Sequence, residues 1–258
     1  MKKHLLFLLI IMFYGCTESN LAFHPRLNPS NGTLELVQTF GGSKNDVAKS
    51  VVSTADGGFA VLGYTQSLDG DITDKATEDY DFWMLKFNSE AQLEWNKTYG
   101  GSGDDRGSSL IETSDGGYAL LGYSDSSDGD VSFNNGNRDF WLVKINASGV
   151  LSWEKSFGYE GVDEGVSIIE TSDNHLMLSG VLDVTASGGE GNQGRFSTKH
   201  AGGDYWSIKI TPTGDIVWSR FYGGSFTDSP TGISETLIGG FINVGGSDSN
   251  DVDISNNK

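Results

Sequence analysis

The stretch Trp95-Asn96-Lys97-Thr98-Tyr99-Gly100-Gly101 returns twice further along the chain. Its later copies are Trp153-Glu154-Lys155-Ser156-Phe157-Gly158 and Trp218-Ser219-Arg220-Phe221-Tyr222-Gly223-Gly224, and a weaker copy runs from Leu36 to Gly42. The glycines that close the four copies are 59, 58 and 65 residues apart. A fixed period of this length is typical of tandem-repeat folds, in which each unit buries its apolar face against its neighbours.

Each unit carries further landmarks in the same phase. An Asp follows five residues after the closing glycine, as Asp46, Asp105, Asp163 and Asp228. An Asp-Gly-Gly-aromatic turn comes next, at Asp56 to Phe59 and at Asp115 to Tyr118. An Asp-aromatic-Trp segment with a Lys three residues after the Trp follows, as in Asp81-Phe82-Trp83. These landmarks divide each unit into four short segments.

The segments have the composition of strands. They are rich in β-branched and aromatic residues, alternate with glycine turns, and show no sustained helical period. Four antiparallel strands per unit predict an all-β fold, a β-propeller of four-stranded blades. Residues 32–258 then hold units near 46–99, 105–157 and 163–222, a partial unit at 228–258, and one lone strand near Leu34 to Phe40.

The fourth unit breaks off before its third strand. This pattern predicts a fragment of a larger propeller, or a prematurely ended reading frame, with an open strand edge. A four-bladed ring closed by the lone N-terminal strand is the alternative.

The N-terminus predicts export. Lys2 and Lys3 precede an apolar run of signal-peptide length, from Leu5 to Tyr14, which is too short to span a bilayer. Residues 1–15 followed by Cys16, the single cysteine, resemble a bacterial lipoprotein signal. That resemblance implies lipidation at Cys16, a tether at 16–31 and a place in the cell envelope, at the outer membrane of a Gram-negative bacterium.

The charge restricts the partners. The chain has 35 acidic and 17 basic residues and a formal net charge of −18. Such a surface repels phosphate backbones and anionic headgroups, so nucleic acid is excluded as a partner and the membrane is reached through the lipid anchor only. Proteins, glycans and cations such as Ca²⁺ remain compatible.

The recurring tryptophans Trp95, Trp153 and Trp218 follow a turn that ends in Gly in two of the three units. This resembles the tryptophan-docking pattern of quinoprotein-like and WD40-like propeller repeats, where the indole packs between blades. Residues 33–258 as a whole look closest to the uncharacterised repeat lipoproteins of Bacteroidetes-type bacteria. The resemblance implies a propeller at the envelope, and no known reaction.

Aspartates flank a glycine between the second and third segments of a unit. Asp69 and Asp71 do so in the first unit, and Asp128 and Asp130 in the second. Their oxygens are the hard ligands that Ca²⁺ prefers, although the full calcium-loop spacing is missing. Ordinary Asx turns without a metal are the alternative.

The third unit is longer than the others, and its extra residues lie in one loop, between Gly180 and Asp204. The loop places a basic spot and an aromatic group on an acidic protein, namely Arg195, Phe196, Lys199 and His200. Binding residues accumulate on loops of rigid scaffolds, so these four form a candidate binding loop. A Gly-rich loop without a ligand is the alternative.

Enzyme signatures are missing from the sequence. The few histidines form no zinc-binding spacing, and no nucleophile elbow or phosphate loop is present. Charges repeated in every unit, such as Asp46 and Lys86, indicate structural hydrogen bonds. We therefore expect a non-catalytic binding or scaffold module for a protein or glycan. The alternatives are a propeller enzyme, either quinone-dependent or polysaccharide-cleaving, and a non-functional truncated fragment.

Overall fold

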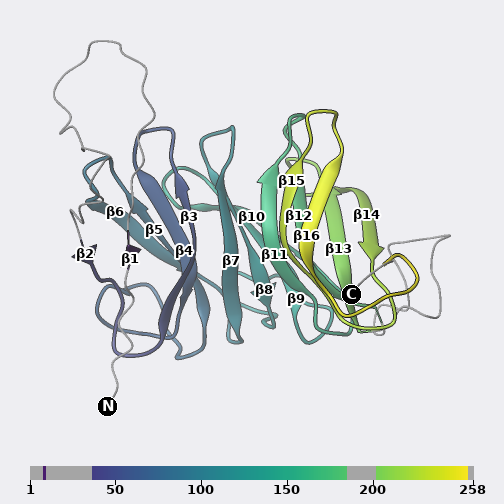
Figure 1. Ribbon diagram of the computed structural model, residues 1–258. Coiled ribbons are helices and arrows are strands. Elements are labelled where there is room, and N and C mark those ends of the chain that lie inside the picture. The colour runs from purple at the N-terminus through teal and green to yellow at the C-terminus, as the bar shows by residue number, and fades with distance from the viewer. Residues whose placement is uncertain (1–7, 10–36, 185–201, 255–258) are drawn as a thin grey trace, which may run out of the picture.

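The computed structural model describes residues 8–9, 37–184 and 202–254 of the chain, and every regular element among them is a β-strand (Figure 1). The strands form three four-stranded antiparallel sheets, a two-stranded sheet at the C-terminal side and a short pair at the N-terminal side. The predicted all-β fold of four-stranded blades is confirmed.

Each blade is a meander of four consecutive strands. The first blade holds β3 (Asp46–Ser53), β4 (Phe59–Thr65), β5 (Asp81–Phe87) and β6 (Leu93–Tyr99). The second holds β7 (Asp105–Glu112), β8 (Tyr118–Ser124), β9 (Asp139–Ile145) and β10 (Leu151–Phe157). The third holds β11 (Glu164–Glu170), β12 (Leu176–Asp183), β13 (Gly203–Ile210) and β14 (Ile216–Tyr222). The strand boundaries follow the repeat landmarks closely.

The fourth blade is partial. It contains β15 (Asp228–Glu235) and β16 (Phe241–Ser247), which form a two-stranded sheet among the described strands. At the other end, β2 (Val37–Gln38) pairs with β1 (Leu8–Leu9). Within the described residues, the predicted lone strand near Leu34 to Phe40 is present as β2, and β2 does not pair with the fourth blade.

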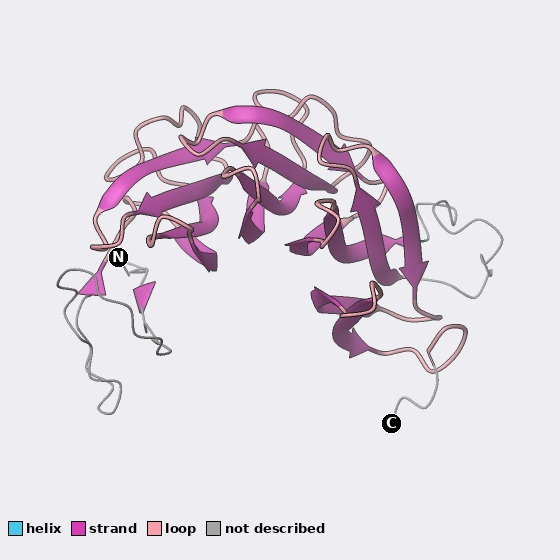
Figure 2. Ribbon diagram, turned by 90° about the horizontal axis from the view of Figure 1, so that it is seen from above, coloured by secondary structure: helices cyan, strands magenta, loops and turns pink. Residues whose placement is uncertain are grey.

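The blades form an open arc. Figure 2 shows them side by side around a common centre, with a gap between the N-terminal and C-terminal ends. The first strands of successive blades, β3, β7, β11 and β15, lie against one another, as innermost strands do in a propeller. A ring closed by the N-terminal strand, the alternative considered above, is not formed among the described residues.

The turn between the first and second strands has the same form in every blade. In the first blade Gly57 N–H donates to Thr54 O at 2.9 Å, and Gly57 has φ 87°. This left-handed conformation is the reason for glycine at that position. In the third blade Asn174, with φ 59°, replaces it, and Asn tolerates this region better than most residues.

The hydrophobic core lies between blades. The third strands of the second and third blades each turn a buried tryptophan toward the blade before: Trp141 packs edge-on against Phe82 at 4.7 Å, and Trp206 against Phe140 at 4.9 Å. The fourth-strand tryptophans pack toward the next blade, as Trp95 does against Tyr118 at 6.3 Å. Packing between blades, which the repeat predicted for the fourth-strand tryptophans, is confirmed.

Candidate functional site

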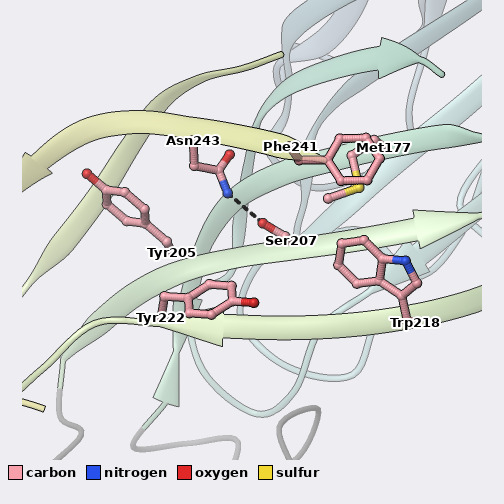
Figure 3. Close-up of a pocket in the computed structure, with 7 residues that line it drawn as sticks. All are labelled: Met177, Tyr205, Ser207, Trp218, Tyr222, Phe241 and Asn243. Carbon is pink, nitrogen blue, oxygen red and sulfur yellow. Dashed lines mark hydrogen bonds between the residues drawn. The ribbon is translucent and has the colours of Figure 1, made fainter. Parts of the chain in front are cut away.

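A cavity of about 470 Å³ lies where the third blade meets the partial fourth blade (Figure 3). Seven side chains from β12, β13, β14 and β16 line it, namely Met177, Tyr205, Ser207, Trp218, Tyr222, Phe241 and Asn243. Figure 3 shows Trp218, Met177 and Phe241 gathered at one end, with the two tyrosines toward the other. The cavity is therefore an aromatic pocket with a polar pair in its middle.

The pocket occupies a junction that is filled between the first two blades. The seven equivalent residues there belong to or pack against one core cluster, and they are Ala60, Phe82, Met84, Trp95, Tyr99, Tyr118 and Leu120. Trp141, Val143 and Ile145 of β9 complete that cluster. Among the described strands, none follows β16 in the same place. The pocket is the space that a third strand fills in the complete blades.

The polar groups of the pocket are departures from the repeat. Ser207 stands where the other blades have Met84 and Leu142, and Asn243 stands where they have apolar residues such as Leu120. Asn243 Nδ2 donates to Ser207 Oγ at 2.7 Å, and Ser179 Oγ donates to Asn243 Oδ1 at 2.9 Å. This pair keeps its polar atoms satisfied and gives the pocket wall hydrogen-bonding capacity.

The tyrosines add further polar tips. Tyr205 Oη donates to the carbonyl of Gly246 at 3.1 Å, and partial burial raises the pKa of Tyr205. No Asp, Glu, His, Lys or Arg occurs among the seven lining residues. Aromatic faces combined with neutral donors and acceptors suit binding of a neutral or apolar group, since aromatic side chains offer large contact areas and polar tips.

Pairs of aspartates are buried at the blade junctions, beside the glycines that close the repeat. A methyl group at Gly100 would lie 2.6 Å from Asp81 Oδ1 and 2.7 Å from Asp105 Oδ2, so only glycine fits. Burial, together with a smaller effect of neighbouring carboxylates, raises the pKa of Asp81 to about 7 and that of Asp105 to about 6. Lys75 Nζ, 2.8 Å from Asp81 Oδ1, opposes the rise at Asp81.

The aspartates that begin the first strands make structural hydrogen bonds. Asp105 Oδ2 accepts from Gly101 N–H at 2.7 Å, and Asp46 and Asp228 accept from Gly42 and Gly224 in the same way. These bonds tie the loop after one blade to the first strand of the next. The structural role predicted from their repetition is confirmed.

The repeated lysines pair with the turn aspartates of their own blades. Lys86 Nζ lies 2.7 Å from Asp56 Oδ2, and Lys144 and Lys209 pair with Asp115 and Asp173 at 2.9 and 2.8 Å. The lysine lowers the pKa of Asp56 to about 2, with help from Thr54. Each lysine therefore fastens the third strand to the tip of the first hairpin.

The candidate calcium residues hold loops together. Asp69 Oδ1 accepts from Ser43 N–H at 2.7 Å, and Asp71 Oδ2 accepts from Gly41 N–H at 2.8 Å. Asp128 and Asp130 make the same contacts with Ser102 and Gly100, at 2.7 and 3.2 Å.

Asp128 and Asp130 also line a cavity of about 310 Å³. Within the described part of the chain, no three Asp, Glu, His or Cys side chains are grouped to hold a metal ion. These hydrogen bonds run to N–H groups 26 or 30 residues away, whereas an Asx turn is closed by an N–H two residues on, so the four aspartates tie separate loops together. Calcium binding stays a prediction.

Two predicted sites lie outside the described residues. These are the lipidation site Cys16 and the candidate binding loop of Arg195, Phe196, Lys199 and His200. Sequence reasoning missed the pocket. The sequence signal for the pocket is that Ser207 and Asn243 replace apolar residues at two positions that face the core in the other blades.

A comparison of the sequence with models of known protein families gives no match. A comparison with curated proteins gives none either. No helix capable of crossing a membrane occurs in the described ranges 8–9, 37–184 and 202–254. The fold and the junctions between its sheets define the chain as a β-propeller-like repeat protein with an open arc of blades.

Proposed function

We propose that this chain is a non-catalytic binding or scaffold module that holds a protein or a glycan at the cell envelope. The pocket between the third and fourth blades carries the proposal. It combines four aromatic side chains with a neutral hydrogen-bonding pair, and none of the described residues that line it is charged. Such a lining binds a ligand through contact area and hydrogen bonds, and it offers no carboxylate or imidazole for acid–base chemistry.

The anchor belongs to the same proposal. A lipid on Cys16 and a tether at residues 16–31 would hold the blades at the surface of the outer membrane, with the acidic domain kept off anionic headgroups. A scaffold of rigid blades fits this role because its junctions are set by buried packing, so that its binding surface is preformed.

Array binding tests the proposal. The purified chain is applied to glycan and peptide arrays beside two variants, Trp218→Ala in the pocket and Phe133→Ala as control. Phe133 is a 60% exposed phenylalanine of the second blade, outside the pocket lining. We expect some ligands to bind both the unmodified chain and the Phe133→Ala control, and we expect Trp218→Ala to lose binding of these ligands. Ligands retained by Trp218→Ala would place binding elsewhere, and turnover of an array ligand would refute the non-catalytic role.

A further inference from the structure

The loop between β4 and β5 holds a lysine that is withdrawn from solvent. The side chain of Lys75 is 0% exposed, and its Nζ lies 2.5 Å from Asp79 Oδ1 and 2.8 Å from Asp81 Oδ1. The side chains of Asp79 and Asp81 are themselves only 14% and 10% exposed. One amine and two carboxyl groups are thus held in contact at a place that excludes most of the solvent.

The two carboxyl groups meet the lysine in different ways. Asp79 Oδ1 accepts a hydrogen bond from Lys75 Nζ and a second one, at 2.9 Å, from Thr77 Oγ1. Asp81 Oδ1 is buried and makes no hydrogen bond of ordinary geometry with the described residues, although Lys75 Nζ is in contact with it. The amine nitrogen therefore lies against the Asp81 carboxyl group without the alignment of a hydrogen bond.

The surroundings favour the neutral form of the Asp81 carboxyl group. Burial raises its pKa to about 7; the nearby Lys75 opposes the rise, and the carboxyl groups of Asp79 and Asp105 add to it. A large share of the molecules therefore holds a proton on Asp81 near neutral pH. The hydroxyl of a protonated carboxyl group can leave as water, whereas the oxygen of a carboxylate cannot.

We propose that Lys75 and Asp81 form an intramolecular isopeptide bond in the folded chain. Asp79 takes one proton from the Lys75 ammonium group, and Nζ then attacks Cγ of the protonated Asp81. The Nζ–Cγ bond forms and the bond from Cγ to the hydroxyl breaks. The hydroxyl leaves as water with a second hydrogen from Nζ, the third hydrogen stays on the amide, and Asp79 returns its proton to solvent. Nothing is oxidised or reduced.

The neighbouring cavity gives this water an exit. Lys75 and Asp81 both line the cavity of about 310 Å³ described above. The bond closes a ring from residue 75 to residue 81, next to Asp74, which accepts from the N–H of Thr98 in β6 at 3.0 Å. The loop is thereby fixed to the first blade. The amide also removes Asp81 from titration and leaves Asp163 unchanged. Formation of the bond does not depend on the binding role of the pocket.

The second blade supplies an internal comparison. Asp139 begins β9 as Asp81 begins β5, and Asp139 Oδ1 is likewise buried without a hydrogen-bond partner among the described residues. The segment 131–138 before it contains no lysine, and the N–H of Asn135 donates to Asp139 Oδ2 at 2.7 Å. We therefore expect no loss of water at Asp139.

Peptide mass spectrometry of the purified full chain tests the proposal. Trypsin cleaves after lysine, so an unlinked chain releases residues 50–75 and 76–86 as separate peptides. The linked chain resists cleavage after Lys75 and yields residues 50–86 as one peptide that is lighter by one water, about 18 Da. Fragmentation should show a ring closed between residues 75 and 81. Complete cleavage after Lys75, with peptides of full mass, would overturn the proposal.

Three variants separate the isopeptide bond from other losses of water. An aspartate before a glycine, such as Asp69, can lose water by forming a succinimide with its own backbone. Lys75→Arg keeps the positive charge but forms no amide, and a loss of water that persists in this variant would refute the proposal. Asp81→Asn should still form the bond but release ammonia in place of water. Asp79→Asn removes the proton acceptor and should slow the reaction by about 100-fold or more. A ring closed at residue 79 instead of residue 81 would contradict the assigned pair.

Discussion

Stability of this protein should increase on mild acidification, because its blade junctions bury carboxyl groups. Asp163 is fully buried, and burial raises its pKa from 3.8 to about 6, against two backbone N–H groups that lower it. The folded state therefore holds a proton on Asp163 over a range in which the unfolded state has lost it. Asp81 and Asp105 behave alike, with pKa values of about 7 and about 6.

The sign and size follow from linkage. A carboxyl group whose pKa is raised in the folded state lowers the free energy of unfolding when the pH is above the folded-state pKa. This loss of stability disappears as the pH falls toward the unfolded-state pKa. For Asp163 the change from 3.8 to about 6 corresponds to about 3 kcal/mol. Asp56, with a pKa lowered to about 2, contributes stability that is lost only below about pH 4, the pKa of an unperturbed aspartate. The free energy of unfolding should thus rise between pH 7.5 and pH 5.

Urea unfolding at several pH values measures this. We expect the free energy of unfolding to increase from pH 7.5 to pH 5, and the increase to be smaller by about 1.4 kcal/mol in Asp163→Asn, because pH 5 lies about one unit below the folded-state pKa of about 6 and still above the unfolded-state value. Asp56→Asn is the matched control, since its titration lies outside the window, and its pH dependence should equal that of the unmodified chain over this range. A midpoint that falls steadily between pH 7.5 and pH 5 would refute the account of the buried carboxyl groups.

Three further predictions follow from single residues. Trp141→Ala should lower the free energy of unfolding by about 3–5 kcal/mol, because a fully buried indole between two blades is lost, and a loss below about 1 kcal/mol in urea unfolding would contradict the packing. Replacement of Asp69 and Asp71 by Asn should lower the melting temperature in the absence of Ca²⁺, because loop hydrogen bonds are lost. A melting temperature that rises in millimolar Ca²⁺, with a rise that disappears in Asp128→Asn and Asp130→Asn, would establish a cation site instead. When the protein is expressed in cells, labelled palmitate should be incorporated into it, and Cys16→Ser should abolish the incorporation. Label retained in Cys16→Ser would exclude Cys16 as the lipid anchor.

Much of the fold could be predicted because the repeat supplies independent copies of each landmark. Asp46, Phe59 and Asp81 are landmarks of the first unit, which spans residues 46–99, and β3, β4 and β5 begin at these three residues while β6 ends at Tyr99. Glycine turns and alternating apolar residues are local signals of strands, and the same signals recur at the same positions of each unit. The partners of the repeated lysines were not predictable, because Lys86 and Asp56 are 30 residues apart and many aspartates compete.

The candidate site was harder to predict, since it depends on packing between units. Ser207 and Asn243 differ from their counterparts by polarity alone, and each looks like an ordinary surface residue in sequence. Only their positions facing each other across a blade junction make a pocket wall. For the loop of Asp69 and Asp71 the sequence predicts either a cation or an Asx turn, but both side chains accept from backbone N–H groups of a segment 26 to 30 residues away, a contact that local sequence does not reveal.

Hydrogen exchange at β16 tests the central claim most directly, because β16 supplies Phe241 and Asn243 to the pocket lining. The exchange rates of residues 241–247 are compared with and without a ligand that the arrays identify. We predict slower exchange in β16 when the ligand is bound, with β4 and β8 unchanged because neither lines the pocket. Unchanged exchange in β16 at saturating ligand would contradict the claim that this pocket is the binding site.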